Sequence, residues 1–141
     1  MSAEKHFAAV RTLLVAGPNL ANRVFDTARV DAQGQLIRDT YAVLFGGTPD
    51  DRDDDRNTAP QQVDSTAEYV YTTRSVSITA DGARKVADQV AAALIGKVAT
   101  VTGRRCDPLR QTLGGDAEPD RSVTPPLYYI DDEYTLVSRR A

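Results

Sequence analysis

A long polar stretch limits how this chain can fold more than any other feature does. Residues 46–66, GGTPDDRDDDRNTAPQQVDST, hold six aspartates, two arginines and almost no bulky apolar side chain. A segment of this composition cannot bury enough apolar surface to offset the entropy lost on ordering. Its charge is −4 and that of the whole chain is −3, so the acidity of the protein is local. We therefore expect a mobile acidic loop, because compact domains rarely keep an irregular connection this long without a functional reason.

The segments beside this loop have the residue pattern of strands. Residues 35–45 alternate between two faces, and residues 67–79 are rich in tyrosine, threonine and valine. The loop would then project from a central hairpin made by these two strands. A turn at residues 31–34 further predicts that residues 22–30 pair with 35–45 as a second hairpin.

Two segments have the spacing of helices. Residues 2–15 place apolar side chains at helical intervals and end before Gly17-Pro18. Residues 82–95 repeat the pattern with an alanine-rich inner face, and Asp81 is placed to cap the start.

The remaining segments complete the fold prediction. Strand-like pieces follow at residues 98–105, 109–113, 127–130 and 133–139. The order of elements predicts one α+β domain over residues 1–141. Its sheet is mainly antiparallel, and both helices pack on one face.

Composition limits the class of protein. The chain has 141 residues, of which 41% are hydrophobic, enough for one modest core. It holds no apolar run of membrane-spanning length, so we expect no membrane association. The single cysteine excludes an internal disulfide and fits a reducing compartment.

Common catalytic signatures are missing from the sequence. The chain has one histidine, His6, and one cysteine, Cys106, and it lacks a Walker A loop, GxGxxG and GxSxG. A zinc site would lack ligands. Alternating aspartates in the loop match the start of an EF-hand, but Arg56 and Gln62 stand where that loop needs glycine and glutamate. We therefore expect no enzyme activity, no metal and no cofactor.

Arginines accumulate near the C-terminus. Two interpretations stay open: they contact phosphates or the acidic loop of a neighbouring copy, or they are ordinary surface charges. The cluster consists of Arg104, Arg105, Arg110, Arg121, Arg139 and Arg140.

The order of elements and four short stretches resemble the tail terminator proteins of long-tailed bacteriophages. The stretches are 41–45 (YAVLF), 103–106 (GRRC), 124–128 (TPPLY) and 131–138 (DDEYTLVS). This resemblance implies a ring, usually of six copies, at the head-proximal end of the tail tube. The ring stops tube polymerisation and joins the tail to the head connector.

The resemblance also implies the partners and the location. The partners are other copies of the chain, the tail tube protein and the head–tail connector, and DNA passes through the ring without specific binding. The protein would be assembled in the host cytoplasm into the virion. The family has no catalytic residues.

We take the loop aspartates as a candidate lumen or interface segment and three arginines as candidate interface cations. These residues are Asp50, Asp51, Asp53, Asp54 and Asp55, with Arg104, Arg105 and Arg110. Three alternatives remain: a related head-completion or tail-completion connector, a small monomeric binding module, and a small carboxylate enzyme.

Overall fold

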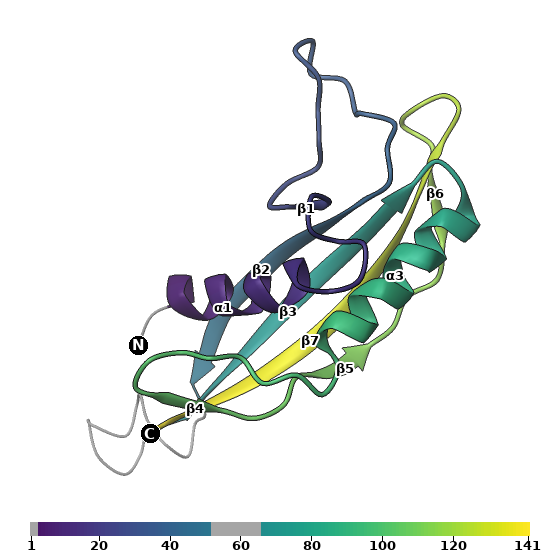
Figure 1. The fold of residues 1–141 in the computed structure, drawn as a ribbon. Helices are drawn as coiled ribbons and strands as arrows, with labels where there is room; N and C mark the ends of the chain where they lie inside the picture. Colours follow the sequence, from purple (N-terminus) through teal and green to yellow (C-terminus); the bar gives the residue numbers. More distant parts are fainter. Residues whose placement is uncertain (1–2, 52–65) are drawn as a thin grey trace.

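The α+β class is confirmed by the arrangement of helices and strands (Figure 1). The computed structural model describes residues 3–51 and 66–141, with side chains for residues 3–47 and 66–141. Its helices are α1 (Ala3–Val15) and α3 (Ala80–Leu94). Its strands are β1 (Val24–Phe25), β2 (Tyr41–Asp51), β3 (Thr66–Ser77), β4 (Arg104–Cys106), β5 (Arg110–Leu113), β6 (Glu118–Asp120) and β7 (Leu127–Arg140).

The described strands form one sheet around three long strands. Its order is β1-β2-β3-β7-β4, and β5 and β6 pair with β7 along the same outer edge as β4. The pairing of β3 with β7 is continuous from Thr66↔Arg139 to Ser77↔Tyr128. All pairs are antiparallel except β1 with β2. The predicted central hairpin of β2 and β3 is therefore confirmed.

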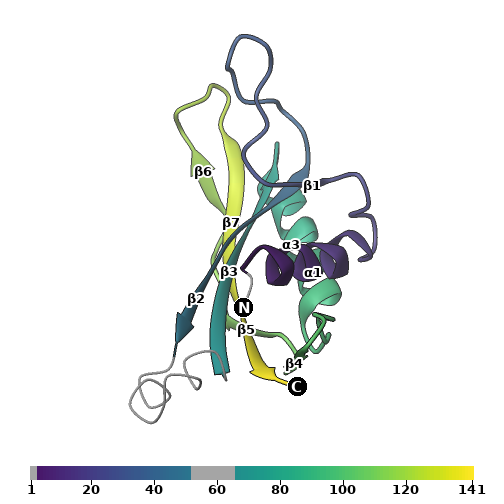
Figure 2. The same ribbon diagram turned by 90° about the vertical axis from the view of Figure 1, so that its left-hand side faces the viewer.

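Both helices cover the same face of the sheet, as Figure 2 shows with the sheet seen nearly edge-on. Side chains of β3 alternate, so Tyr69, Tyr71 and Thr73 are buried under the helices. The alanine-rich face of α3 packs onto them, and Gly17 lets the chain after α1 approach α3, because a Cβ there would lie 2.4 Å from that of Ala93. The main core lies between the helices and this face.

Within residues 3–47 and 66–141, side chains cover the opposite face of the sheet at one end. There a second, smaller core joins Tyr41, Val43, Val76 and Leu127, against which Leu36 and Val123 pack. Nearer the β2–β3 connection the same face exposes apolar side chains, with Phe45 at 39% and Val70 at 41%. We call this uncovered part the open face.

The predicted hairpin of residues 22–30 with 35–45 is wrong. Residues 24–25 pair with β2 in parallel, and β2 begins at Tyr41. The turn at 31–34 does form, but the residues on its two sides pair through a single isolated bridge, Val30 with Leu36. The carboxylate of Asp31 accepts hydrogen bonds from the backbone N–H groups of Gln33 and Gln35, which favours a local turn over a ladder.

Several predicted boundaries also shift. Of the predicted strand at 98–105, only Arg104 and Arg105 lie in a strand, β4, and β6 forms where a polar loop was expected. The two pieces at 127–130 and 133–139 are one strand, β7. Asp131 and Asp132 interrupt the apolar pattern, but they do not end the strand. Asp131 binds Arg74 of β3, and Asp132 accepts the backbone N–H of Gly115.

Helix α3 begins at Ala80, and its cap differs from the prediction. The hydroxyl oxygen of Thr79, not the carboxylate of Asp81, accepts the N–H of Gly82 at 2.9 Å. The predicted end is confirmed, because Gly96 follows with φ of +76°.

The predicted loop at 46–66 is shorter than expected at both ends. Strand β2 continues to Asp51, and β3 begins at Thr66. A register shift between Gly46 and Pro49 interrupts the ladder, and Gly46 and Gly47 have positive φ there. This irregularity lets β2 continue past the glycines that the sequence suggested as its end. The remainder of the predicted mobile loop, 52–65, lies outside the described residues.

Candidate functional site

The predicted interface cations lie on one lateral edge of the sheet. Arg104 and Arg105 belong to β4, and Arg110 begins β5. Both strands pair with β7 from its outer side, and Arg139 and Arg140 close β7 beside them. The side chains of Arg105, Arg110 and Arg140 are exposed and have no ion-pair partner among the described residues. The structure thus gathers five arginines that are up to 36 positions apart in the sequence.

The strand register places these arginines opposite one another in two pairs. Arg104 lies directly opposite Arg140, and Arg105 directly opposite Arg139. Like charges in directly opposite positions destabilise an antiparallel pair. One acidic residue relieves them in part, because Arg139 pairs with Asp107. We call Arg104, Arg105, Arg110, Arg139 and Arg140 the basic edge.

Two of the predicted acidic residues lie on the opposite lateral edge. Asp50 and Asp51 are the last residues of β2, opposite Glu68 and Ala67. Strand β1 pairs with β2 only at Ala42 and Val43, so within the described residues β2 has no outer partner from position 44 to 51. The predicted site residues Asp53, Asp54 and Asp55 lie outside the described residues.

The open face between these edges carries an ordered polar network. The Arg74 guanidinium donates to both oxygens of Asp131, at 2.8 and 2.9 Å, from neighbouring strands. The same guanidinium lies 4.6 Å from the ring centre of Tyr129, whose hydroxyl donates to Glu118 at 3.2 Å. The hydrogen bonds to Asp131 raise the pKa of Arg74, so this cation is permanent. The network links β6 to β7 and β3 and places polar groups on the open face.

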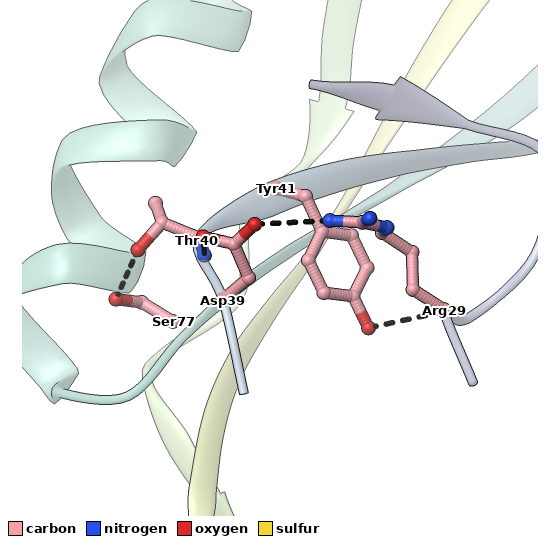
Figure 3. A network of polar contacts seen from close by, with 5 residues as sticks. All are labelled: Arg29, Asp39, Thr40, Tyr41 and Ser77. Atoms are coloured by element: carbon pink, nitrogen blue, oxygen red, sulfur yellow. Dashed lines mark hydrogen bonds and ion pairs between the residues drawn. The ribbon is translucent and has the colours of Figure 1, made fainter. Parts of the chain in front are cut away.

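A second network holds the segment 26–40 against the end of the sheet (Figure 3). Arg29 donates to Asp39 at 2.9 Å, and its backbone N–H donates to the Tyr41 hydroxyl at 3.3 Å. Its guanidinium also lies 4.6 Å from the ring centre of Phe25. Thr40 and Ser77 are linked through their hydroxyls at 3.0 Å. These contacts hold residues 26–40 in an ordered loop outside the sheet.

The histidine belongs to a buried polar cluster that the sequence did not reveal. His6 is fully buried on α1, stacks on Tyr69 at 4.2 Å, and its Nε2 lies 2.9 Å from the Ser138 hydroxyl. Arg104 donates to the same hydroxyl and to the Ser138 carbonyl, both at 2.9 Å. The residues come from opposite ends of the chain, so no spacing rule could have joined them.

This cluster has the composition of a nucleophile and base but not the accessibility. Ser138 is fully buried and Cys106 is 8% exposed, so neither group lies open at the surface. Burial raises the pKa of the Cys106 thiol, against the opposing effects of the bond to Ser138 and the charge of Arg104. The arrangement is suited to fixing α1 and β4 onto β7.

A cavity of about 350 Å³ lies between α3 and the segment joining β5 to β6. Its polar lining includes Asp88, Asp116 and Asp132, with Arg84 at the rim in an ion pair with Asp81. Asp132 is 5% exposed and accepts the backbone N–H of Gly115 at 3.0 Å. Burial, the largest cause, raises the pKa of this carboxyl.

The structure gives two further negative findings. In the ranges 3–51 and 66–141, no group of three or more histidine, cysteine or acidic side chains is arranged to hold a metal ion. Neither described helix is long and apolar enough to cross a membrane.

Comparison with solved structures gives a match over nearly the whole chain. No protein-family model matches the chain, and no curated protein matches it. Among solved structures, the chain is similar to a chain from the "Virion of native gene transfer agent (GTA) particle". The TM-score is 0.67 with 21% identity, over 94% of this chain and 92% of the other. At this identity the similarity establishes a common fold over nearly the full length of both chains.

Proposed function

We propose that this protein is a structural component of a virion with a tail, and that it forms the ring that closes the head-proximal end of the tail tube. The observation that carries the proposal is the shared fold with a chain of a virion particle, over almost the entire length of both chains. The tail-terminating role is the narrower part of the proposal. It rests on the resemblance of the sequence to tail terminator proteins.

The geometry supports a role in assembly. The subunit gathers five arginines on one lateral edge of the sheet and exposes Phe45 and Val70 on the open face. A domain of 141 residues has a radius of gyration of only about 14 Å, so one copy cannot surround a DNA duplex. A role at the end of a tail tube therefore requires several copies, and a closed ring satisfies that requirement.

The partners follow from this position. One surface of the ring would bind the last ring of tail tube protein, and the opposite surface would bind the head–tail connector. DNA would pass through the channel without specific contacts. We propose that the protein performs no catalysis, since its histidine and cysteine are buried and serve packing.

Removal of the gene from a particle-producing genome tests the terminator role. We expect tail tubes of uncontrolled length and heads without tails in electron micrographs, and normal particles after complementation. Particles of normal tail length, joined to heads without this protein, would contradict the proposal. Tails of normal length that fail to join heads would instead support a connector role.

An activity screen tests the absence of catalysis. The purified protein should give only background turnover with esterase, phosphatase, nuclease and glycosidase substrates. Turnover that is lost in both His6→Ala and Cys106→Ala, while each variant stays folded, would contradict a purely structural role.

A further inference from the structure

The cavity between α3 and the segment joining β5 to β6 is lined by small residues on two sides. They are Ala87 and Ala91 of α3, and Gly114, Gly115 and Ala117 of the segment. At Gly115 a Cβ would lie 2.4 Å from the carbonyl oxygen of Asp131, so a side chain there has no room. The cavity volume of about 350 Å³ is near the lower end of the range for small-ligand sites, so it suits one small group.

Asp132 places a buried carboxylate at this cavity. The residue is 5% exposed, and the backbone N–H of Gly115 donates to one of its oxygens at 3.0 Å. Within residues 3–47 and 66–141 its other oxygen has no hydrogen-bond or ion-pair partner. A buried carboxylate is normally paired with a cation or with several donors, because taking its charge out of water costs free energy. Since Asp132 lines the cavity, its second oxygen is an acceptor for a donor that enters there.

The charges around Asp132 favour a cation over an anion. Burial raises the pKa of this carboxyl most, and the negative charges of Asp131 and Asp88 raise it further, against the hydrogen bond from Gly115. Asp88 and Asp116 line the cavity together with Asp132. A positive charge from outside would be attracted by all three carboxylates of the lining, and an anion would be repelled.

The guanidinium at the rim is engaged with another residue. Arg84 lines the cavity, but it pairs with the Asp81 carboxylate at 2.6 Å, and its side chain is 59% exposed. In the described part of the chain it forms no ion pair with Asp132. The buried carboxylate is therefore left without a cationic partner from the described lining.

We propose that this cavity binds a small organic cation, an alkylammonium or guanidinium group, through the second oxygen of Asp132. Asp88 and Asp116 supply the remaining negative charge. A metal ion fits less well, because it needs several oxygen ligands within about 2.6 Å, and the described residues hold no acidic, histidine or cysteine group arranged in that way. The cation is either a free molecule or the end of a basic side chain of an assembly partner. The site lies within one subunit, so the inference goes beyond the proposed ring and does not depend on it.

Titration of the purified protein with n-butylammonium and with n-butylguanidinium at pH 7 tests the site. We expect saturable changes in the amide chemical shifts of Gly114, Gly115 and Asp132. The neutral analogue 1-butanol should bind at least about tenfold more weakly, because it lacks the charge that the carboxylates attract. If neither cation gives saturable shifts at millimolar concentrations, the proposal is wrong.

Variants of the lining separate this site from general attraction to an acidic protein. Asp132→Asn should weaken binding of both cations at least about tenfold, and Asp88→Asn should weaken it less, because Asp88 is exposed. Ala87→Leu should abolish binding by filling the cavity with every carboxylate in place. Glu4→Gln removes an exposed carboxylate of α1 outside the cavity and should change nothing. Thermal melts check that each variant is folded, and equal binding by the wild type and Ala87→Leu would overturn the inference even if Asp132→Asn does not fold.

Co-sedimentation with purified tail tubes distinguishes the two sources of the cation. If Asp132→Asn and Ala87→Leu bind tubes more weakly than the wild type, and n-butylguanidinium competes with the wild type, the cation belongs to a side chain of the tube. If both variants bind tubes normally while the small cations bind the wild type, the site takes a free molecule. A wild type that binds the cations but no tubes supports the site and contradicts the proposed function.

Discussion

At the scale of single residues, several buried polar side chains of this chain are tolerated because they have hydrogen-bond partners. Asp132 lies in the middle of β7 at 5% exposure, although an aspartate in that position suggests a strand end. It is tolerated because the backbone of Gly115 donates to it and because the cavity beside α3 leaves it partly solvated. His6 and Ser138 are likewise buried and serve to position α1.

The substitution Asp132→Asn should stabilise the protein at neutral pH. Burial raises the folded pKa above the unfolded value, so the folded state binds the proton more tightly and stability falls as pH rises through that range. Asparagine keeps an acceptor for Gly115 and removes the buried charge. The variant should therefore melt above the wild type at pH 7, and the gap should close as pH falls below the unfolded pKa of about 3.9.

Thermal melts of both proteins between pH 3 and pH 8 measure this effect. Asp116→Asn is the matched control, because Asp116 lines the same cavity but is exposed. A wild type more stable than Asp132→Asn at pH 7 would show that the charge of Asp132 has a partner that stabilises the fold.

The Cys106 thiol should react slowly in the folded protein. It is 8% exposed and burial raises its pKa, so both access and the thiolate fraction are low. Iodoacetamide at pH 8 should label it at least about tenfold more slowly than a free cysteine, and fully after unfolding in urea. Rapid labelling of the native protein would mean that β4 opens readily from β7.

At the scale of elements, periodic segments were predictable and pairing between distant segments was not. The spacing of apolar residues located α1 and α3, and alternation located β3 and the greater part of β2. It failed at residues 22–40, where Asp31 and Arg29 form local polar contacts that outcompete a ladder. It also failed for β6, which is short and polar and depends on pairing with β7.

The candidate site was likewise predictable from the sequence only in part. The sequence indicated that Arg104, Arg105 and Arg110 act together, and the structure places all three on one edge. The like-charge pairs with Arg139 and Arg140 depend on strand register, which a sequence without an alignment does not contain. The position of Asp50 and Asp51 within a strand was hidden by the glycines before them, which resemble a strand end.

The irregular part of β2 should be sensitive to substitution. Gly46 has φ of +91°, and a Cβ there would lie 2.8 Å from the carbonyl oxygen of Val70. Gly34 has a similar φ of +79° with no atom within 4 Å, so Gly34→Ala measures the backbone cost alone, about 1 kcal/mol. Gly46→Ala should cost at least about 1 kcal/mol more, because the added contact is with backbone.

Urea denaturation of both variants measures this difference in the free energy of unfolding. Equal destabilisation would show that β2 can move away from Val70, and that the register shift is not fixed by close packing. A larger loss for Gly46→Ala would show that close backbone packing against Val70 fixes the register shift.

At the scale of the whole molecule, part of the sheet surface is exposed in a single subunit. Among the described residues, one face of the sheet is covered by helices and the other at one end, and five arginines gather on one lateral edge. The proposed ring would cover part of this surface and leave two surfaces for the tail tube and the connector.

The mass of the wild-type protein in solution tests the proposed ring most directly. Analytical ultracentrifugation over a wide concentration range, with and without tail tubes, would be followed by electron microscopy of any large species. We predict one discrete species near six times the subunit mass of 15.3 kDa, seen as rings with a central channel. A monomer at every concentration, with no rings on tube ends, would contradict the account.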